Sequence, residues 1–245
     1  MNTPFSIITQ PVFSDLTYKK FVLVDFSSQS TESEAIMSFQ TDFDFLLNYS
    51  ARNHILQIQI KFPYDWTNFY KILESDYNFS PGLCFIEKKI NRNFLFPSRV
   101  QPIIVLKDIK NLLIRQQIYH FSLDPSYFIE ASKFKLNEYM RYLGKIVGDK
   151  KGIIYGIYME KSLIGFIGLE EEFPGIYINE LILDENFRRQ GFGKMLMEAG
   201  FNYIFKEKKE KMWTTLSIKN SSALNFYLNC GFNPMAYRFY LNLKN

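Results

Sequence analysis

The residues best suited to chemistry lie in one stretch of the chain, residues 180–194. It reads as a strand and a short turn, followed by a loop with two glycines that opens a helix. Glycine lets the backbone approach a bulky anion closely, and the first amides of a helix have no internal partner and carry the positive end of its dipole. Because Arg188, Arg189 and Lys194 add full charges, the stretch predicts a cradle for a pyrophosphate.

A glycine pair after a strand is equally compatible with an ordinary turn. The pattern G-x-x-x-x-G-K-[ST] is absent, and no G-x-G-x-x-G follows the first strand. The loop is therefore neither a Walker A motif nor a Rossmann fingerprint, and taken alone it leaves the anion site and the plain turn both open.

A second cluster follows some thirty residues later. Asn220 stands where a strand gives way to a helix, a natural capping position. Ala223, Phe226 and Tyr227 are spaced by three and four residues, so they share one face of that helix, and Gly231 ends it. The alternative is a capped amphipathic helix in which Tyr227 is simply a core aromatic.

The elements that must position these residues form a regular series after a seam at residues 91–102, which carries two prolines and no clear period. We predict a strand, two helices and a hairpin whose tip is at residues 160–162. A turn then leads to a third strand, which is followed by a helix, a strand, a helix and a final strand. Asp108 is the expected cap of the first helix. The expected ranges, in chain order, are 103–106, 108–119, 127–146, 152–159, 163–170, 176–183, 191–205, 212–218, 221–229 and 236–243.

Before the seam the sequence predicts a smaller unit of strands and at least one helix. Residues 20–26, 54–60 and 83–90 read as strands, the second with apolar and polar residues in alternation. A helix is expected between residues 63 and 76, where aromatic residues recur at helical spacing. We therefore divide the chain into an N-terminal αβ unit, residues 1–98, and a second domain, residues 99–245.

Composition narrows the class of protein. Of the 245 residues 47% are apolar and 22% charged, a balance that supports a packed core, and the net charge of +4 is too small to indicate a nucleic-acid partner. Two cysteines cannot by themselves make a disulfide framework or a four-ligand zinc site, and two histidines disfavour a histidine-based metal centre, so we expect no metal. No signal-peptide pattern or membrane-spanning stretch is evident, which favours a cytoplasmic protein without a membrane partner.

In this order of strands and helices, the two clusters together resemble the acyl-CoA-binding half of the GCN5-related N-acetyltransferase (GNAT) superfamily. The resemblance covers residues 100–245. The residues that carry it are Arg188, Gly191, Gly193, Asn220, Ala223, Tyr227, Gly231 and Phe232. It implies an α/β (α+β) fold with a mixed, mostly antiparallel central sheet that is splayed at the acyl-CoA site, here preceded by the smaller αβ unit.

The resemblance also implies a reaction, the direct attack of a primary amine on the thioester of acetyl-CoA. The site is the gap where residues 176–183 and 212–218 splay apart. Tyr227 matches the general acid. Glu180, which precedes Leu181 on the strand that lines the cleft, is the candidate base or a ligand of the substrate amine; the alternative is a solvent-facing strand residue. The residues implied to hold acetyl-CoA are Leu181, Ile182, Leu183, Arg188, Arg189, Gln190, Gly191, Phe192, Gly193, Lys194 and Asn220.

A narrower likeness concerns the acceptor. Residues 119–125, which include His120, and the C-terminal residues 236–240 are similar to the amino-sugar nucleotide acetyltransferases of the TDP-fucosamine type. This implies a nucleotide-linked amino-dideoxy sugar as the amine, although His120 is also explained as a capping or core residue. The alternatives are a protein N-terminus, a polyamine or an aminoglycoside as acceptor, or a non-catalytic acyl-CoA-binding module. The N-terminal unit is expected to be a degenerate GNAT-like half, a substrate-side wall or a homodimer contact.

Overall fold

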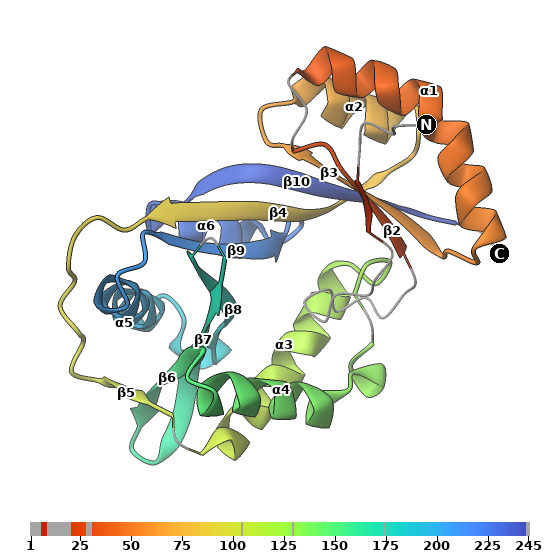
Figure 1. The fold of residues 1–245 in the computed structure, drawn as a ribbon. Helices are drawn as coiled ribbons and strands as arrows, with labels where there is room; N and C mark the ends of the chain where they lie inside the picture. The colour runs from red at the N-terminus through yellow and green to blue at the C-terminus, as the bar shows by residue number, and fades with distance from the viewer. Residues whose placement is uncertain are drawn as a thin grey trace.

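One twisted sheet runs through the part of the chain that the structure describes, which comprises residues 6–8, 21–27, 31–103, 105–128, 130–173 and 175–243 of a computed structural model (Figure 1). Its ten strands follow the order β1-β2-β3-β10-β4-β9-β8-β7-β6-β5. The pairs β2–β3 and β8–β9 are parallel and the other pairs are antiparallel. The prediction of a mixed, mostly antiparallel sheet with helices is therefore confirmed.

The strands are β1 (Ser6–Ile8), β2 (Phe21–Asp25), β3 (Gln57–Pro63), β4 (Ser80–Lys89), β5 (Val100–Pro102), β6 (Gly152–Met159), β7 (Ser162–Glu172), β8 (Gly175–Leu183), β9 (Lys211–Ser217) and β10 (Asn233–Asn242). The helices are α1 (Glu32–Arg52), α2 (Thr67–Ser75), α3 (Lys110–Leu123), α4 (Leu136–Gly148), α5 (Phe192–Lys206) and α6 (Ser221–Asn229). From β5 onward their order is the predicted series of strands and helices, and the bounds of α6 match the prediction residue for residue.

Three differences from the predicted elements lie just after the seam. The first strand, β5, lies at residues 100–102 and not at the predicted 103–106, and residues 106–109 form a 3₁₀ turn. Asp108 lies in that turn and does not cap α3, which begins after Ile109 without a side-chain cap. The Asp108 carboxylate instead accepts a hydrogen bond from the Tyr158 hydroxyl at 3.4 Å. The predicted strand and the helix at 127–146 each include one residue outside the described ranges, 104 and 129.

The predicted helix at 127–146 begins only at Leu136, in α4. Tyr127 is held in the turn after α3 by tertiary packing, since its ring contacts Tyr240 of β10 with 5.1 Å between centroids. Asp124, which is buried, accepts hydrogen bonds from the Tyr240 hydroxyl and from the Ser126 amide. These bonds fix a turn where helical periodicity alone predicts a helix.

In the N-terminal part the helix α1 was not predicted. Thr31 caps it by accepting a hydrogen bond from the Glu34 amide at 3.3 Å, and Glu32 and Glu34 favour the positive end of the helix dipole. The spacing of Thr31 and Glu34 is a capping-box signal that the sequence does carry. The strand expected at 54–60 begins later, at Gln57, because His54 occupies a turn with a φ of 51°.

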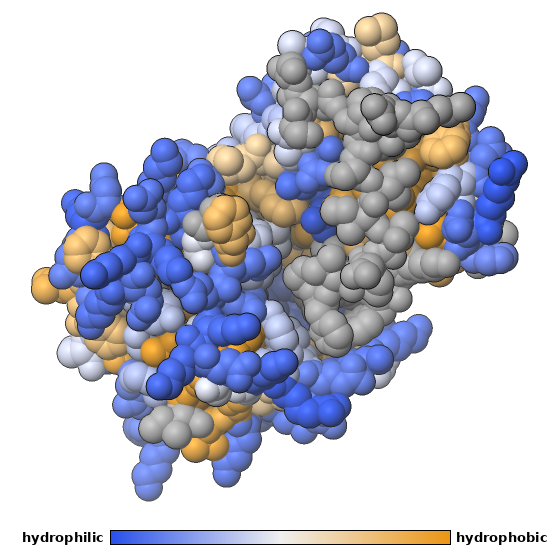
Figure 2. Space-filling model, viewed as in Figure 1, coloured by the Kyte–Doolittle hydropathy of each residue, from blue (hydrophilic) through white to orange (hydrophobic). Residues whose placement is uncertain are grey.

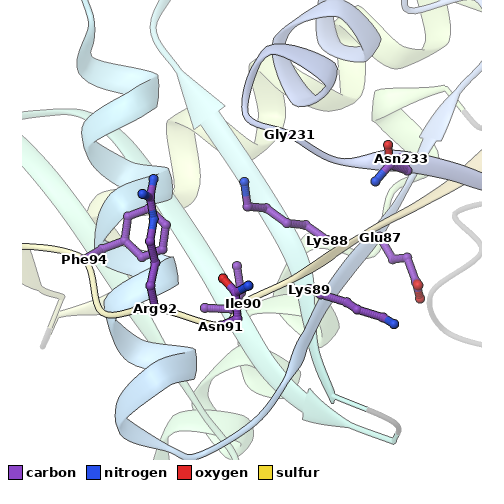
Figure 3. A pocket seen from close by; sticks show the side chains of 9 residues that line it. All are labelled: Glu87, Lys88, Lys89, Ile90, Asn91, Arg92, Phe94, Gly231 and Asn233. Carbon is purple, nitrogen blue, oxygen red and sulfur yellow. The ribbon is translucent and has the colours of Figure 1, made fainter.

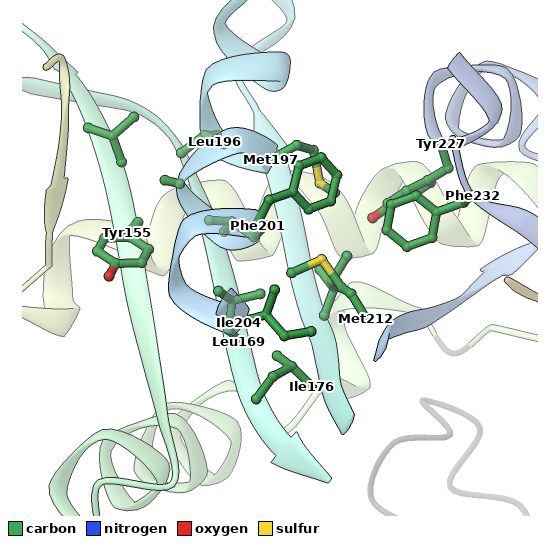
Figure 4. Packing of buried hydrophobic residues seen from close by; sticks show 14 of the residues in the cluster. Tyr155, Leu169, Ile176, Leu196, Met197, Phe201, Ile204, Met212, Tyr227 and Phe232 are labelled. Atoms are coloured by element: carbon green, nitrogen blue, oxygen red, sulfur yellow. The ribbon is translucent and has the colours of Figure 1, made fainter. Parts of the chain in front are cut away.

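Helices cover the sheet in separate groups, each with its own core (Figure 1). Helices α1 and α2 pack on β2, β3 and β10 around Phe39 and Phe69. Helices α3 and α4 pack on β6–β8 around Leu143 and Phe166. Helix α5 packs on β6–β9, where Met197, Phe201 and Ile204 meet Met212 (Figure 4). The surface visible in Figure 2 is largely hydrophilic, with hydrophobic side chains in small separate groups.

The seam at residues 91–102 does not separate two sheets. Strand β4 precedes the seam, yet it pairs with β9 on one side and with β10 on the other, both antiparallel. The N-terminal part thus supplies an interior strand of the sheet that carries residues of the C-terminal part.

We predict that residues 99–245 alone do not fold cooperatively, because removing β4 leaves β9 and β10 without their shared partner and takes Cys84 and Ile86 out of the core that they share with Met212 and Leu216. Thermal unfolding of the fragment by circular dichroism should show no sharp transition, and co-expression with residues 1–98 should restore one. A cooperative transition of the isolated fragment would show that the C-terminal part is autonomous.

Candidate active site

Strands β8 and β9 are joined at one end and separate at the other. The parallel ladder holds only the pairs Ile176–Met212 and Tyr177–Trp213. Immediately beyond it, the Thr214 hydroxyl donates to the carbonyl of Ile178 at 2.9 Å, so a side chain replaces the ladder bond. From there on, neither strand has a ladder partner on the side that faces the other. The splayed gap predicted for residues 176–183 and 212–218 is present in the structure.

A β-bulge in β8 lies beside this gap. The register with β7 passes from the pair Leu169–Ile178 to the pair Gly168–Glu180, so Asn179 is an extra residue that pairs with no residue of β7. Bulges bend a strand and re-aim its side chains. The Asn179 amide donates to Glu170 at 3.0 Å, which holds the bulge in place. The bulge therefore helps to turn β8 away from β9 and sets the direction of Glu180.

A cavity of about 140 Å³ occupies the gap. Residues of β8, β9, α3, α4 and α6 and of the turn after α3 line it, together with one residue of β4. Two residues predicted to be catalytic, Glu180 and Tyr227, both line this cavity, and so do Leu181 and Asn220. The other lining residues are Leu83, Gln116, His120, Tyr127, Phe128, Tyr139, Tyr142, Tyr177, Ile178, Asn179, Thr214, Thr215, Leu216, Ser217 and Ala223.

Glu180 is a buried carboxyl group, with 8% of its surface exposed. Burial penalises the carboxylate and raises the pKa of Glu180 to about 7. Hydrogen bonds from Tyr139 and Gln116 oppose that rise, and the Tyr139 hydroxyl lies 2.6 Å from Oε1. A carboxyl group with a pKa near 7 can exist in both protonation states at neutral pH, which is the property a general base or acid needs.

Tyr227 projects from α6 beside the core of α5, next to Phe232 (Figure 4). Its ring packs edge-on against Phe226 and Phe232, with centroids 5.6 and 5.2 Å away. Burial, followed by the nearby Tyr177 and Glu180, raises the pKa of Tyr227 far above its ordinary value. The phenol is therefore neutral throughout the working pH range and keeps a proton that it can donate in a hydrogen bond or transfer.

The glycine loop leads from β8 into α5. Gly191 is the N-cap of α5 and has a φ of 86°, a left-handed conformation that suits glycine, and no side chain caps the first amides of the helix. A Cβ on Gly193 would meet the ring of Phe226 at 3.2 Å, so this glycine brings α5 close to α6. Arg188, Arg189 and Lys194 are exposed on the same loop. The geometry fits an anion at the start of α5.

The remaining residues predicted to hold the acyl donor lie at the end of β8, in the loop that follows it, and at the starts of α5 and α6. The side chains of Ile182 and Phe192 are buried in the core, so only their backbone faces outward. The Arg188 Nε donates to the Leu183 carbonyl at 3.2 Å, and the Gln190 amide donates to the Asn186 carbonyl at 3.0 Å. Asn220 is the predicted cap of α6, and its Oδ1 accepts from the Ala223 amide at 3.1 Å.

The sequence did not point to the residues of α3 and α4 that line the cavity. Tyr139 lies 41 residues before Glu180, and Gln116 lies farther still, so no local spacing links them. Their signal is only that each lies on the inward face of a helix. His120, which the sequence analysis did name, lines the cavity, and its ring is tilted by 32° against that of Phe128 with 5.0 Å between centroids.

A second cavity of about 420 Å³ lies at the far end of β4 (Figure 3). Lys88, Lys89 and Arg92 make it basic, but two of these cations already have neighbours. Lys88 donates to the carbonyl of Cys230 at 2.5 Å, and Arg92 lies over the ring of Phe94. None of the predicted site residues lines this cavity.

Among the described residues, no group of three or more His, Cys, Asp or Glu side chains is placed to hold a metal ion. No helix within those same ranges is both long and apolar enough to cross a membrane.

Comparisons with known proteins agree with this geometry. Residues 115–232 match the family model described as acetyltransferase (GNAT) family. A GCN5-related N-acetyltransferase from Sphaerobacter thermophilus has a similar structure, with a TM-score of 0.62 at 10% identity over 98% of this chain and 76% of that one. A tandem GNAT protein from the clavulanic acid biosynthesis pathway gives 0.56 at 9% identity over 92% and 76%. A functionally unknown conserved protein from Staphylococcus epidermidis gives 0.55 at 13% identity over 99% and 96%.

Proposed function

We propose that the protein transfers the acetyl group of acetyl-CoA to a primary amine, because residues 115–232 match the acetyltransferase (GNAT) family model. The observation that carries the proposal is the meeting of Glu180 and Tyr227 in one cavity at the splayed end of β8 and β9. The glycine loop after β8 stands at the same end of the strand, where it can hold the diphosphate of the donor.

We propose that acetyl-CoA lies along the open edge of β8. Beyond Tyr177 the backbone of β8 has no ladder partner on the edge that faces β9. The backbone groups of residues 181–183 on that edge are therefore available to hydrogen-bond the amides of the pantetheine arm. The amides at the start of α5, with Arg188, Arg189 and Lys194, hold the pyrophosphate. Asn220 stands near the thioester end, where it lines the cavity.

The two catalytic candidates divide the proton transfers between them. The acceptor arrives as an ammonium ion, and Glu180 takes its proton directly or through water. The free amine then forms the C–N bond as the C–S bond breaks. Tyr227 donates to the departing sulfur, which has a parent pKa of ~8.5 by analogy with cysteine. Tyr139 is a positioning residue, because its hydroxyl holds Oε1 of Glu180.

For the acceptor we retain the amino group of a nucleotide-linked amino-dideoxy sugar as the finer proposal, supported by the likeness at residues 119–125 and 236–240. Such a substrate brings a diphosphate of its own, which needs a basic subsite outside the cavity. A protein N-terminus, a polyamine and an aminoglycoside are the competing acceptors. A substrate screen with purified protein and acetyl-CoA separates them.

We propose further that the N-terminal unit, residues 1–98, is a degenerate GNAT-like half that also serves as a wall on the substrate side. The similarity to a tandem GNAT protein over 92% of this chain supports the first part. Leu83 of β4, which lines the cavity, supports the second. A homodimer contact of the same unit is tested by the molar mass in solution, measured by light scattering.

The loop assignment predicts that Gly191→Val weakens acetyl-CoA binding by at least about tenfold. A β-branched residue is strained at a φ of 86°, by on the order of 1–3 kcal/mol, so the loop must move away from the diphosphate. Calorimetric titration with acetyl-CoA gives the Kd. Gly148→Val is the control, because a Cβ at Gly148 meets nothing within 4 Å. Equal affinities for the Gly191 variant and the wild type would remove the loop from the donor site.

A further inference from the structure

Two polar atoms on α3, at the wall of the active-site cavity, have no hydrogen-bond partner among the described residues. They are Nδ1 of His120 and Oε1 of Gln116, both buried, and both residues line the cavity. The two residues are four apart, so they share one face of α3. A buried polar group without a partner costs about 1–3 kcal/mol, which a bound ligand can recover.

The orientation of Gln116 follows from its neighbour Glu180. The bond from Gln116 lowers the pKa of Glu180 and therefore stabilises its carboxylate form, which only accepts, so this bond uses the NH₂ group of Gln116. Its oxygen, Oε1, is therefore the atom left over, and it requires a donor.

His120 requires a partner of a different kind. Burial lowers the pKa of His120 to about 4, so the imidazole is neutral at physiological pH. In a neutral imidazole Nδ1 is a donor in one tautomer and an acceptor in the other. A hydroxyl group both donates and accepts, so it satisfies Nδ1 in either tautomer and also satisfies Oε1 of Gln116.

The charge of the cavity wall limits the ligand further. Among the described residues that line the cavity there is no Lys or Arg, and Glu180 is the one acidic residue. The nearby Lys219 ammonium is held 3.0 Å from the Asp124 carboxylate. A phosphate or carboxylate placed here would find no cation and would face Glu180, which disfavours binding.

We propose that the acceptor is a compact primary amine that carries hydroxyl groups and no anionic group in the part that enters the cavity. His120 and Gln116 form hydrogen bonds with these hydroxyl groups. This inference rests on the proposed acetyltransferase function and narrows the class of its acceptor. Glu180 meets the ammonium, and the two residues of α3 meet hydroxyls on the same small molecule. A nucleotide-linked sugar meets this description only if its diphosphate stays outside the cavity.

The first test compares three amines as acceptors with saturating acetyl-CoA. D-glucosamine carries hydroxyls, cyclohexylamine is a ring amine without them, and glucosamine 6-phosphate adds an anion. The expected kcat/KM for glucosamine is about 10- to 100-fold above that for cyclohexylamine, the range of one or two hydrogen bonds. Glucosamine 6-phosphate should be the poorer of the two sugars. Equal values for glucosamine and cyclohexylamine, or a preference for the phosphate, would overturn the inference.

The second test changes His120. The variant His120→Phe keeps a ring against Phe128 and lacks both nitrogens, so the preference for glucosamine over cyclohexylamine should fall about tenfold. A residue that only supports the fold would change both amines alike. His120→Gln, which again offers a donor and an acceptor, should recover part of the preference. The control is His54→Asn, exposed and at a φ of 51° that Asn tolerates, which should keep the wild-type ratio.

A binding measurement separates failure of this inference from failure of the proposed function. Glucosamine and cyclohexylamine are titrated calorimetrically into the full chain saturated with CoA, where no turnover is possible. Tighter binding of glucosamine that depends on His120 supports the inference even if no acetyl transfer occurs. Acetyl-CoA binding without acetylation of any amine would refute the proposed function. Absence of glucosamine binding to the CoA complex would refute the inference.

Discussion

Replacing Tyr227 by Phe is expected to lower kcat by about 100-fold or more and to leave the Kd for acetyl-CoA within about twofold of the wild-type value. The phenol is the one proton donor placed on α6 at the mouth of the splayed strands, and its neutral state at all working pH values keeps the proton available. Loss of the hydroxyl removes the hydrogen bond that forms on the departing sulfur, an interaction present in the transition state and absent from the ground state.

The substitution is structurally mild. Phenylalanine preserves the packing of the ring against Phe226 and Phe232, so only the hydroxyl and its bond with Thr214 are lost. Tyr203→Phe is the matched control, because Tyr203 borders the same core and does not line the cavity. Its kcat should equal the wild-type value. An unchanged kcat for the Tyr227 variant would remove this residue from the mechanism.

The parts of the fold that are local in sequence were predictable. Helix α6 has its cap, its apolar face and its terminating glycine within twelve residues, so every signal needed was contiguous. The hairpin of β6 and β7 and the glycine loop before α5 are local in the same way. Their order along the chain, together with the resemblance to the GNAT superfamily, was enough to place β8 beside β9 and to expect the gap between them.

Features that arise from distant contacts were not predictable. Strand β4 pairs with β9 and β10, which lie more than 120 residues farther along, and no spacing in the sequence encodes that insertion. Tyr127 lies in a turn because Tyr240 and Asp124 hold that turn from outside it. The pairing of Tyr139 with Glu180 likewise exists only after α4 has packed on β8.

The bulge at Asn179 belongs to the same class. Its residues read as continuous strand, and the extra residue is apparent only when the register with β7 is known. The catalytic candidate Glu180 was chosen for its place on the strand, whereas its burial and its raised pKa depend on the helices that cover it. The position of Glu180 on the strand was therefore accessible from the sequence, but its raised pKa was not.

Replacing Glu180 by Gln is expected to lower kcat/KM by about 100-fold or more at pH 7.5 and to change the pH profile. In the wild type, activity should rise as pH increases through about 7, where Glu180 loses its proton. In the variant this limb should be absent, and only the rise due to deprotonation of the free amine at higher pH should remain. Tyr227 titrates far above this range and contributes no limb of its own.

The same change should raise stability, in a pH-dependent way. The folded-state pKa of Glu180, about 7, lies above the ordinary value of 4.5, so the folded state binds the proton more tightly than the unfolded state. The stabilising effect is complete below pH 4.5 and is lost as pH rises through 7, a loss on the order of 3 kcal/mol. Gln carries no charge, so Glu180→Gln should unfold at a higher temperature than the wild type at pH 8, with the difference vanishing near pH 4.

These two effects together separate catalysis from structure. Glu87→Gln is the control, since Glu87 of β4 is a part-buried carboxylate that pairs with Lys211 at 3.1 Å and does not line the cavity. It should change neither the pH profile nor kcat/KM.

If Glu180→Gln gains stability at pH 8 but keeps full activity, Glu180 is a buried carboxylate that does not act as the base. If activity falls while the limb near pH 7 persists, the group that titrates there is another one, and Glu180 only binds the amine. Loss of activity and of the limb, with the gain in stability, assigns the proton transfer to Glu180, because the burial that destabilises its charged form is the same burial that tunes its pKa.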